Sequence, residues 1–128
     1  MNAQAPQSYS AAVERLHQWQ AQEADEINPL CRTQLLAHGH KTDRVIIFLH
    51  GFTNCPHQFC QLATLFHARG YTVLNVRLPQ HGFANRLTTA LAQLTAQAMI
   101  DLTNDAIDIA HGFGEHVTLF GFSLGGVL

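Results

Sequence analysis

The chain has 128 residues, of which 47% are hydrophobic and 12% are charged, and its formal net charge is −2. This length and composition are typical of one globular domain or part of one, and they exclude a disordered or fibrous protein. Because no block of Lys or Arg residues is present, we expect no binding to nucleic acid or to an anionic membrane, and the expected partner is a small molecule.

The cysteines and the N-terminus bear on the cellular compartment. Cys31, Cys55 and Cys60 are an odd number without CxxC spacing, which predicts reduced thiols and favours a cytoplasmic location. The first residues contain neither a basic segment nor an apolar stretch, so we expect no signal peptide or lipid anchor. No apolar run reaches about 18 residues, so we expect no membrane span.

The chain contains nine histidines, which raises the question of a metal site. None of them has HExxH or Cys/His ligand spacing, so we expect no bound metal and no cofactor. We interpret most of them as surface or loop residues.

Residues 8–26 carry apolar side chains at helical spacing among polar ones, which predicts an amphipathic helix with Ser8 or Ser10 as its N-cap. Pro29 ends this helix, because the residue before a proline avoids the helical region. We therefore divide the chain into an N-terminal helical extension, residues 1–29, and a main domain, residues 30–128.

Strands and helices alternate along the main domain. The predicted strands cover residues 31–38, 45–49, 71–78 and 117–120, and the predicted helices cover residues 56–69 and 95–111. The run at 45–49 is continuously apolar and rich in β-branched residues, which is typical of a strand buried on both faces. Residues 83–93 are expected to form a loop with a short helix. This alternation predicts right-handed crossovers and a mainly parallel sheet with helices on both faces, the α/β class.

The segment Gly121-Phe122-Ser123-Leu124-Gly125 fits the pattern GxSxG. It follows a predicted strand and precedes small residues that open a helix, which is the setting of a nucleophile elbow. A sharp turn there would present Ser123 at its tip, and side chains at the two glycine positions would collide with the adjoining strand or helix. The alternative is a glycine-rich turn that only connects a strand to a helix.

Three motifs occur in a fixed order: FLHGF at 48–52, RLPQHG at 77–82 and GFSLGG at 121–126. With them the sequence resembles the α/β-hydrolase family, in the branch of carboxylesterases, monoacylglycerol-lipase-like enzymes and serine-aminopeptidase-like hydrolases. The resemblance runs from about Arg44 to Leu128. It departs from the family pattern at Gln80, where a glycine is common. It implies the N-terminal portion of an α/β-hydrolase fold, incomplete at the C-terminus.

The resemblance also implies an oxyanion hole made by the backbone N–H groups of Phe52 and Leu124. Acyl transfer develops negative charge on the carbonyl oxygen, and fixed dipoles together with a helix N-terminus stabilise that charge. The supporting positions in the loop and the elbow are His50, Gly51, Gly121 and Gly125. The alternative for His50 and Gly51 is a turn that merely ends a strand.

A serine nucleophile needs a histidine base, and that histidine needs an orienting carboxylate. In this fold the order along the chain is Ser, then Asp or Glu, then His. The five residues after Ser123 contain neither, so we expect the chain to be incomplete. Upstream groups are not expected to substitute: three aspartates should lie on the solvated side of their helix, and three histidines lie on loops at the carboxyl edge of the sheet. These residues are Asp101, Asp105, Asp108, His50, His57 and His81.

The sequence thus predicts a serine hydrolase that acts on a small or lipid-like carboxylic ester through an acyl-enzyme on Ser123. A serine at this position disfavours the dehalogenase and epoxide-hydrolase branches, which use a carboxylate nucleophile. Cofactor-free haloperoxidase and carbon–carbon bond hydrolase activities share this elbow and stay open. The alternative from another class is a non-catalytic fragment or binding module of the same fold.

Overall fold

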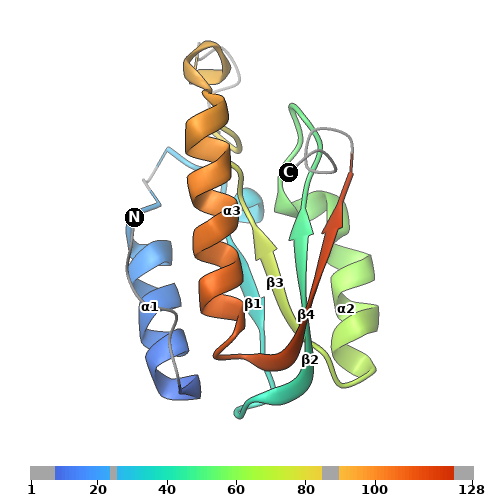
Figure 1. Ribbon diagram of the computed structural model, residues 1–128. Helices are drawn as coiled ribbons and strands as arrows, with labels where there is room; N and C mark the ends of the chain where they lie inside the picture. Colours follow the sequence, from blue (N-terminus) through green and yellow to red (C-terminus); the bar gives the residue numbers. More distant parts are fainter. Residues whose placement is uncertain (1–7, 24–25, 85–89, 123–128) are drawn as a thin grey trace.

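The computed structural model describes residues 8–23, 26–84 and 90–122 (Figure 1). The helices and strands are α1 (Tyr9–Ala21), β1 (Gln34–Leu36), β2 (Thr42–Leu49), α2 (Cys60–Ala68), β3 (Thr72–Val76), α3 (Ala96–Ala110) and β4 (Gly114–Gly121). Short 3₁₀ helices are η1 (Pro29–Cys31), η2 (Pro56–Phe59) and η3 (Ala90–Gln93). Among the described residues, no helix is both long and apolar enough to cross a membrane.

The strands form one sheet in the order β1-β3-β2-β4. β2 pairs in parallel with β3 on one side and with β4 on the other, whereas β1 runs antiparallel to β3. Helices α1 and α3 cover one face of the sheet and α2 covers the other (Figure 1). The expectation of a mainly parallel sheet with helices on both faces is therefore confirmed.

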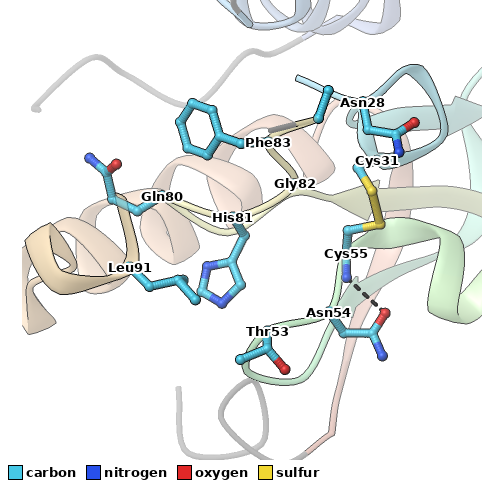
Figure 2. A pocket seen from close by; sticks show the side chains of 11 residues that line it. Asn28, Cys31, Thr53, Asn54, Cys55, Gln80, His81, Gly82, Phe83 and Leu91 are labelled. Atoms are coloured by element: carbon cyan, nitrogen blue, oxygen red, sulfur yellow. Dashed lines mark hydrogen bonds between the residues drawn. A yellow bond between two sulfur atoms is a disulfide. The ribbon is translucent and has the colours of Figure 1, made fainter. Parts of the chain in front are cut away.

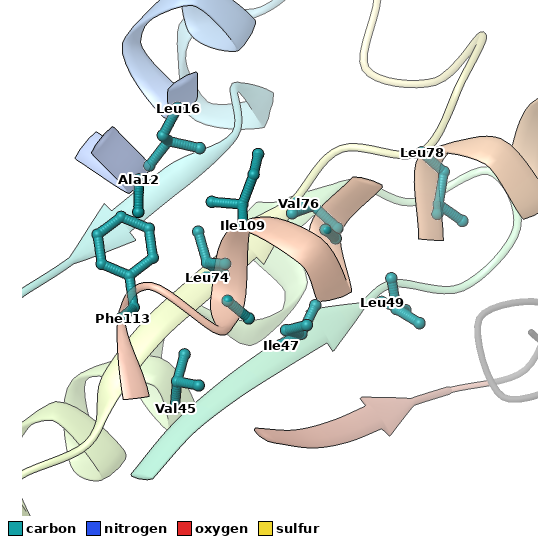
Figure 3. Packing of buried hydrophobic residues seen from close by; sticks show 12 residues of the cluster. Ala12, Leu16, Val45, Ile47, Leu49, Leu74, Val76, Leu78, Ile109 and Phe113 are labelled. Atoms are coloured by element: carbon teal, nitrogen blue, oxygen red, sulfur yellow. The ribbon is translucent and has the colours of Figure 1, made fainter. Parts of the chain in front are cut away.

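β2 lies at the centre of the sheet, and its side chains alternate between two apolar clusters. Val45, Ile47 and Leu49 pack on the side of α1 and α3 (Figure 3), and Ile46 and Phe48 pack on the side of α2. All five are at most 2% exposed. Burial of each such side chain contributes about 1.5–3 kcal/mol, so a continuous apolar run is what a two-sided strand requires.

Side-chain caps set the starts of two helices. Ser8 accepts a hydrogen bond from the Ala11 N–H at the start of α1, and Thr95 accepts one from the Ala98 N–H at the start of α3. Of the two expected caps for the first helix, Ser8 therefore fills the N-cap position. Each cap satisfies one backbone donor that the helix itself leaves unpaired.

The first helix ends at Ala21, earlier than the sequence predicts. The chain after it forms backbone hydrogen bonds with the loop that follows β3 instead. The Asn28 N–H donates to the Gly82 oxygen at 2.8 Å, the Ala84 N–H donates to the Glu26 oxygen, and Ile27 forms an antiparallel bridge with Phe83. Pairing with a distant segment thus replaces the last helical turns, which local periodicity cannot reveal.

The start of the chain shares the core of the sheet. Ala12 and Leu16 on α1 are fully buried and pack in the same cluster as Ile109 on α3 and Phe113 after it (Figure 3). At Gly112 a Cβ atom would lie only 2.6 Å from the Ala12 Cβ. The close approach of α1 to the end of α3 therefore depends on the missing side chain at Gly112. The division of the chain at residue 29 stays a prediction.

We expect Gly112→Ala to destabilise the protein by about 1–3 kcal/mol, because the added methyl group overpacks the contact with α1. Combining it with Ala12→Gly should cost less than the sum of the two single changes, since the clash is removed. Urea unfolding of the four proteins measures this coupling. Strictly additive effects would contradict the contact.

Candidate active site

The carboxyl ends of the three parallel strands lie at one edge of the sheet. His50 follows β2, Arg77 follows β3, and Gly121 closes β4 beside Leu49. The Phe122 N–H donates to the Leu49 oxygen at 3.1 Å, which holds the end of β4 against the end of β2. The expected nucleophile Ser123, the second oxyanion donor Leu124 and the elbow residue Gly125 lie outside the described residues.

The loop after β2 begins with a tight turn. The Asn54 N–H donates to the Gly51 oxygen at 3.1 Å, and Thr53 has φ 65°, a left-handed conformation that is unusual for a β-branched residue. Phe52 lies in this turn, and within the described part of the chain its backbone N–H has no hydrogen-bond acceptor. The expected oxyanion donor is therefore available at the carboxyl edge.

Gln58 holds this turn in place. Its side-chain oxygen Oε1 accepts a hydrogen bond from the Gly51 N–H at 3.0 Å, which ties the turn to η2. Sequence reasoning missed this residue, because Gln58 lies in a predicted helix and nothing local indicates that its amide folds back onto the preceding loop.

His50 is fully buried and links β2 to the loop after β3. The Leu78 N–H donates to its Nε2 at 2.9 Å, so Nε2 is an acceptor and Nδ1 carries the proton. Nδ1 then donates to the Gly51 oxygen at 2.9 Å. Burial lowers the pKa of His50 to about 4, with the charge of Arg77 and the neighbouring His81 acting in the same direction. Neither nitrogen is available to accept a proton from a serine.

His81 lies beside His50 and the turn. Its ring centroid is 5.0 Å from that of His50 and 5.7 Å from that of Phe52. Its Nδ1 lies 2.8 Å from the Pro79 oxygen, whereas its buried Nε2 has no hydrogen-bond partner among the described residues. Burial lowers the pKa of His81, and the positive charge of Arg77 adds to the effect.

The loop that carries His81 departs from the family pattern at Gln80, and the structure shows how it does so. Gln80 has φ 62° and Gly82 has φ 83°, so both lie in the left-handed region. At Gln80 a side chain occupies a conformation that glycine adopts freely, at a cost of roughly 1–2 kcal/mol. At Gly82 no side chain fits, because a Cβ would lie 2.9 Å from the Cys31 Cβ.

A buried ion pair anchors the same loop to the N-terminal segment. The Arg77 Nε donates to Glu23 Oε2 at 2.9 Å, and the Glu23 carboxylate also accepts from the hydroxyl and the N–H of Thr33. The Arg77 Nη1 donates to the His81 oxygen at 3.0 Å. Sequence reasoning missed this network, since its members are far apart along the chain.

A cavity of about 430 Å³ opens at this edge (Figure 2). Its walls come from the turn after β2, the loop after β3, the segment before β1 and η3. The lining residues are Asn28, Cys31, Thr53, Asn54, Cys55, Gln80, His81, Gly82, Phe83, Ala84 and Leu91. This size and the mixture of polar and apolar side chains suit a small organic ligand.

The prediction of three reduced thiols is wrong. Cys31 and Cys55 form a disulfide in the cavity wall, with their Cα atoms 5.1 Å apart, and Cys60 is the free thiol (Figure 2). The fold brings η1 against the loop after β2, and the sequence spacing gives no sign of that approach. The expected cytoplasmic location loses the observation on which it rested.

The other upstream groups considered as a base or an acid, one histidine and three aspartates, lie elsewhere. His57 is exposed on η2, and Asp101, Asp105 and Asp108 lie on α3, which covers a face of the sheet. Asp105 is partly buried and not on the solvated side of its helix, and this burial raises its pKa against the opposing charge of Arg15. Among the described residues, no group of three or more His, Cys, Asp or Glu side chains could hold a metal ion.

A family model described as the alpha/beta hydrolase family matches residues 46–128, which is more than half of the chain. This chain belongs to the alpha/beta hydrolase family. The matched region contains the second half of β2, the turn after it, the loop that carries His81 and the GxSxG segment.

Solved structures support the same fold. One, from work on the metagenome-derived lipolytic enzymes LipS and LipT, is similar with a TM-score of 0.68 and 26% identity over 78% of this chain. MenH from S. aureus is similar with a TM-score of 0.56 and 25% identity over 74% of this chain. The chain spans 38% and 34% of the lengths of these two structures. No curated protein matches the sequence.

Protein purified without reductant should contain one free thiol, from Cys60, when it is denatured and labelled. Reduction should lower the free energy of unfolding by about 3 kcal/mol, because the disulfide joins residues separated by 24 positions and so restricts the unfolded chain. Mass spectrometry counts the labelled thiols and urea unfolding measures the loss. Cys60→Ser serves as the control, with no free thiol and the same loss on reduction. Three labelled thiols would contradict the disulfide.

The buried His50 should make stability depend on pH. Its folded pKa of about 4 lies below the value of 6.5 for the unfolded chain, so the unfolded state binds more protons between these values. The contribution is complete above pH 6.5 and is lost as the pH falls toward 4. We expect urea unfolding at pH 7.5 and pH 5 to differ less in His50→Gln than in the wild type. An equal pH dependence in both proteins would show that His50 is not held neutral.

Proposed function

We propose that the protein is a serine hydrolase that cleaves carboxylic esters through an acyl-enzyme on Ser123. One observation carries the proposal: the Phe122 N–H is hydrogen-bonded to the Leu49 oxygen. The GxSxG segment therefore begins beside the turn that offers the Phe52 N–H. Membership of the hydrolase family and the similarity to a structure from work on lipolytic enzymes support the same reading.

In this mechanism the Ser123 hydroxyl oxygen attacks the ester carbonyl carbon, and its proton passes to a histidine base. The negative charge that develops on the carbonyl oxygen is stabilised by the N–H groups of Phe52 and Leu124. The alcohol leaves with a proton from the same base, and water then attacks the acyl-enzyme to release the carboxylic acid.

We infer that the base and its orienting carboxylate come from outside residues 1–128. His50 has both ring nitrogens engaged. His81 keeps an Nε2 that is free among the described residues, but burial and the positive charge of Arg77 lower its pKa, which makes it a weak acceptor for the serine proton. The small share of the two similar structures that this chain spans is in keeping with this inference.

The substrate that we propose is a small or lipid-like ester without a formal charge. The cavity beside the Phe52 turn offers apolar contacts from Phe83 and Leu91 together with polar ones. None of the described residues that line it is an Asp, Glu, Lys or Arg. Because Cys31 and Cys55 form a disulfide, the cysteines no longer favour a cytoplasmic location.

In the full-length protein, Ser123 should react with a fluorophosphonate probe. Ser123→Ala should abolish labelling and lower kcat by about 10⁴-fold or more, because no other group can form the acyl-enzyme. Ser10→Ala is the matched control, since Ser10 is exposed on α1, and it should label as the wild type does. In-gel fluorescence and an ester hydrolysis assay give both readouts. Equal labelling of the Ser123→Ala protein would exclude this nucleophile.

A further inference from the structure

The mechanism leaves one buried polar atom at the site without a role. The His81 side chain is 2% exposed, and its Nε2 has no hydrogen-bond partner among the described residues. A buried acceptor that has lost its water without a replacement costs about 1–3 kcal/mol. An unpaired atom of this kind in a native structure calls for a partner that binds there.

The hydrogen-bond pattern defines what Nε2 can bind. Nδ1 lies 2.8 Å from the Pro79 oxygen, which can only accept, so Nδ1 carries the proton and Nε2 presents a lone pair. The Arg77 guanidinium donates to the His81 backbone oxygen at 3.0 Å, which places a positive charge nearby. Burial and this charge keep the pKa of His81 low, so the ring is neutral at pH 7. An uncharged O–H donor matches this acceptor, whereas an ammonium group would be repelled by Arg77.

The position of the ring relates this acceptor to the reaction. His81 is part of the cavity wall, and its ring reaches between Leu91 and Thr53 (Figure 2). It also packs edge-on against the Phe52 ring, with centroids 5.7 Å apart. Phe52 supplies the proposed oxyanion donor, so a group bound at Nε2 lies close to the ester that is cleaved.

The loop around His81 is fixed in a way that suits binding. Arg77 holds its backbone oxygen, and Gly82 packs against the Cys31 side of the disulfide. The ring therefore does not have to be ordered when a substrate arrives, and this preorganisation reduces the entropic cost of binding.

We propose that His81 is a specificity-determining residue whose Nε2 accepts a hydrogen bond from a hydroxyl group of the substrate, so that the preferred esters carry a hydroxyl near the ester bond. This inference rests on the proposed function, since it concerns the substrate of the same serine hydrolase.

The test compares esters that differ by a hydroxyl in place of a methyl group. One pair, 2-hydroxyethyl butyrate and propyl butyrate, varies the alcohol part. The other pair, ethyl 3-hydroxybutyrate and ethyl 3-methylbutyrate, varies the acyl part. For full-length wild-type protein we expect kcat/KM to favour the hydroxylated ester by about 10-fold or more in at least one pair, since a site with a buried acceptor discriminates against a substrate that leaves it unpaired.

Two variants separate the acceptor from the shape of the loop. His81→Asn places an amide near Nδ1, where it can keep the bond to Pro79, but it removes the acceptor at Nε2. His81→Gln places an amide oxygen near Nε2. We expect the ratio of kcat/KM for the hydroxylated ester to that for the methylated ester to fall toward one in His81→Asn. In His81→Gln we expect part of this preference to persist. A purely structural role would change both esters of a pair equally and leave their ratio unaltered.

The outcomes distinguish the two proposals. The role of His81 is overturned if the ratio of the two kcat/KM values is near one for both pairs in the wild type. It is also overturned if His81→Asn leaves that ratio unchanged. If hydrolysis still depends on Ser123 in that case, the proposed function stands. If Ser123→Ala hydrolyses the esters as the wild type does, the proposed function fails. Should His81→Asn not fold, the comparison of His81→Gln with the wild type decides, because a loss of the preference there despite a retained acceptor contradicts the inference.

Discussion

Parallel pairing of β2 with both β3 and β4 places three strand ends at one edge of the sheet. In the register of the sheet Leu49 is opposite Val76 on one side and Gly121 on the other, so the three chains leave the sheet at the same level. The Phe52 turn, the His81 loop and the GxSxG segment converge only because of this register. A shift of one residue would also reverse the faces of β2 and expose its apolar side chains.

The two loops at this edge hold non-glycine residues in left-handed conformations, Thr53 in one and Gln80 in the other. Such conformations persist only where the surroundings fix them, and they concentrate at functional sites. Here the surroundings are identifiable: Gln58 holds the first loop, and Arg77 holds the second through the His81 oxygen. The strain and its supports lie around the cavity that the proposed substrate would enter.

The sequence predicted the sheet and its helices because the signals for them are local. A continuous apolar run marks β2, and Ser8 and Thr95 mark helix starts that the structure confirms. The features that it missed depend on contacts between distant segments. Glu23 and Arg77 are 54 residues apart, and their ion pair exists only after α1 and β3 have reached their places. The disulfide has the same origin, and for that reason an odd cysteine count was misleading.

The exposed apolar side chains at the end of β4 bear on which part of the protein supplies the catalytic base. Within the described residues β4 pairs with β2 alone, and Leu119, Phe120 and Phe122 are 41–56% exposed. Parallel sheets are covered on both faces, so apolar side chains on this strand favour packing by further polypeptide. That polypeptide would lie beside the end of β4, where the GxSxG segment begins. In the proposed enzyme the cavity beside the Phe52 turn would bind the ester, and polypeptide packed on β4 would supply the base. The Phe120 ring packs against those of Phe48 and Phe59, with centroids 5.5 and 5.7 Å apart, so a change there would also disturb the core on the side of α2. Because the base would be placed by packing on β4, a change to Leu119 should instead affect proton transfer while leaving the His81 side of the cavity intact.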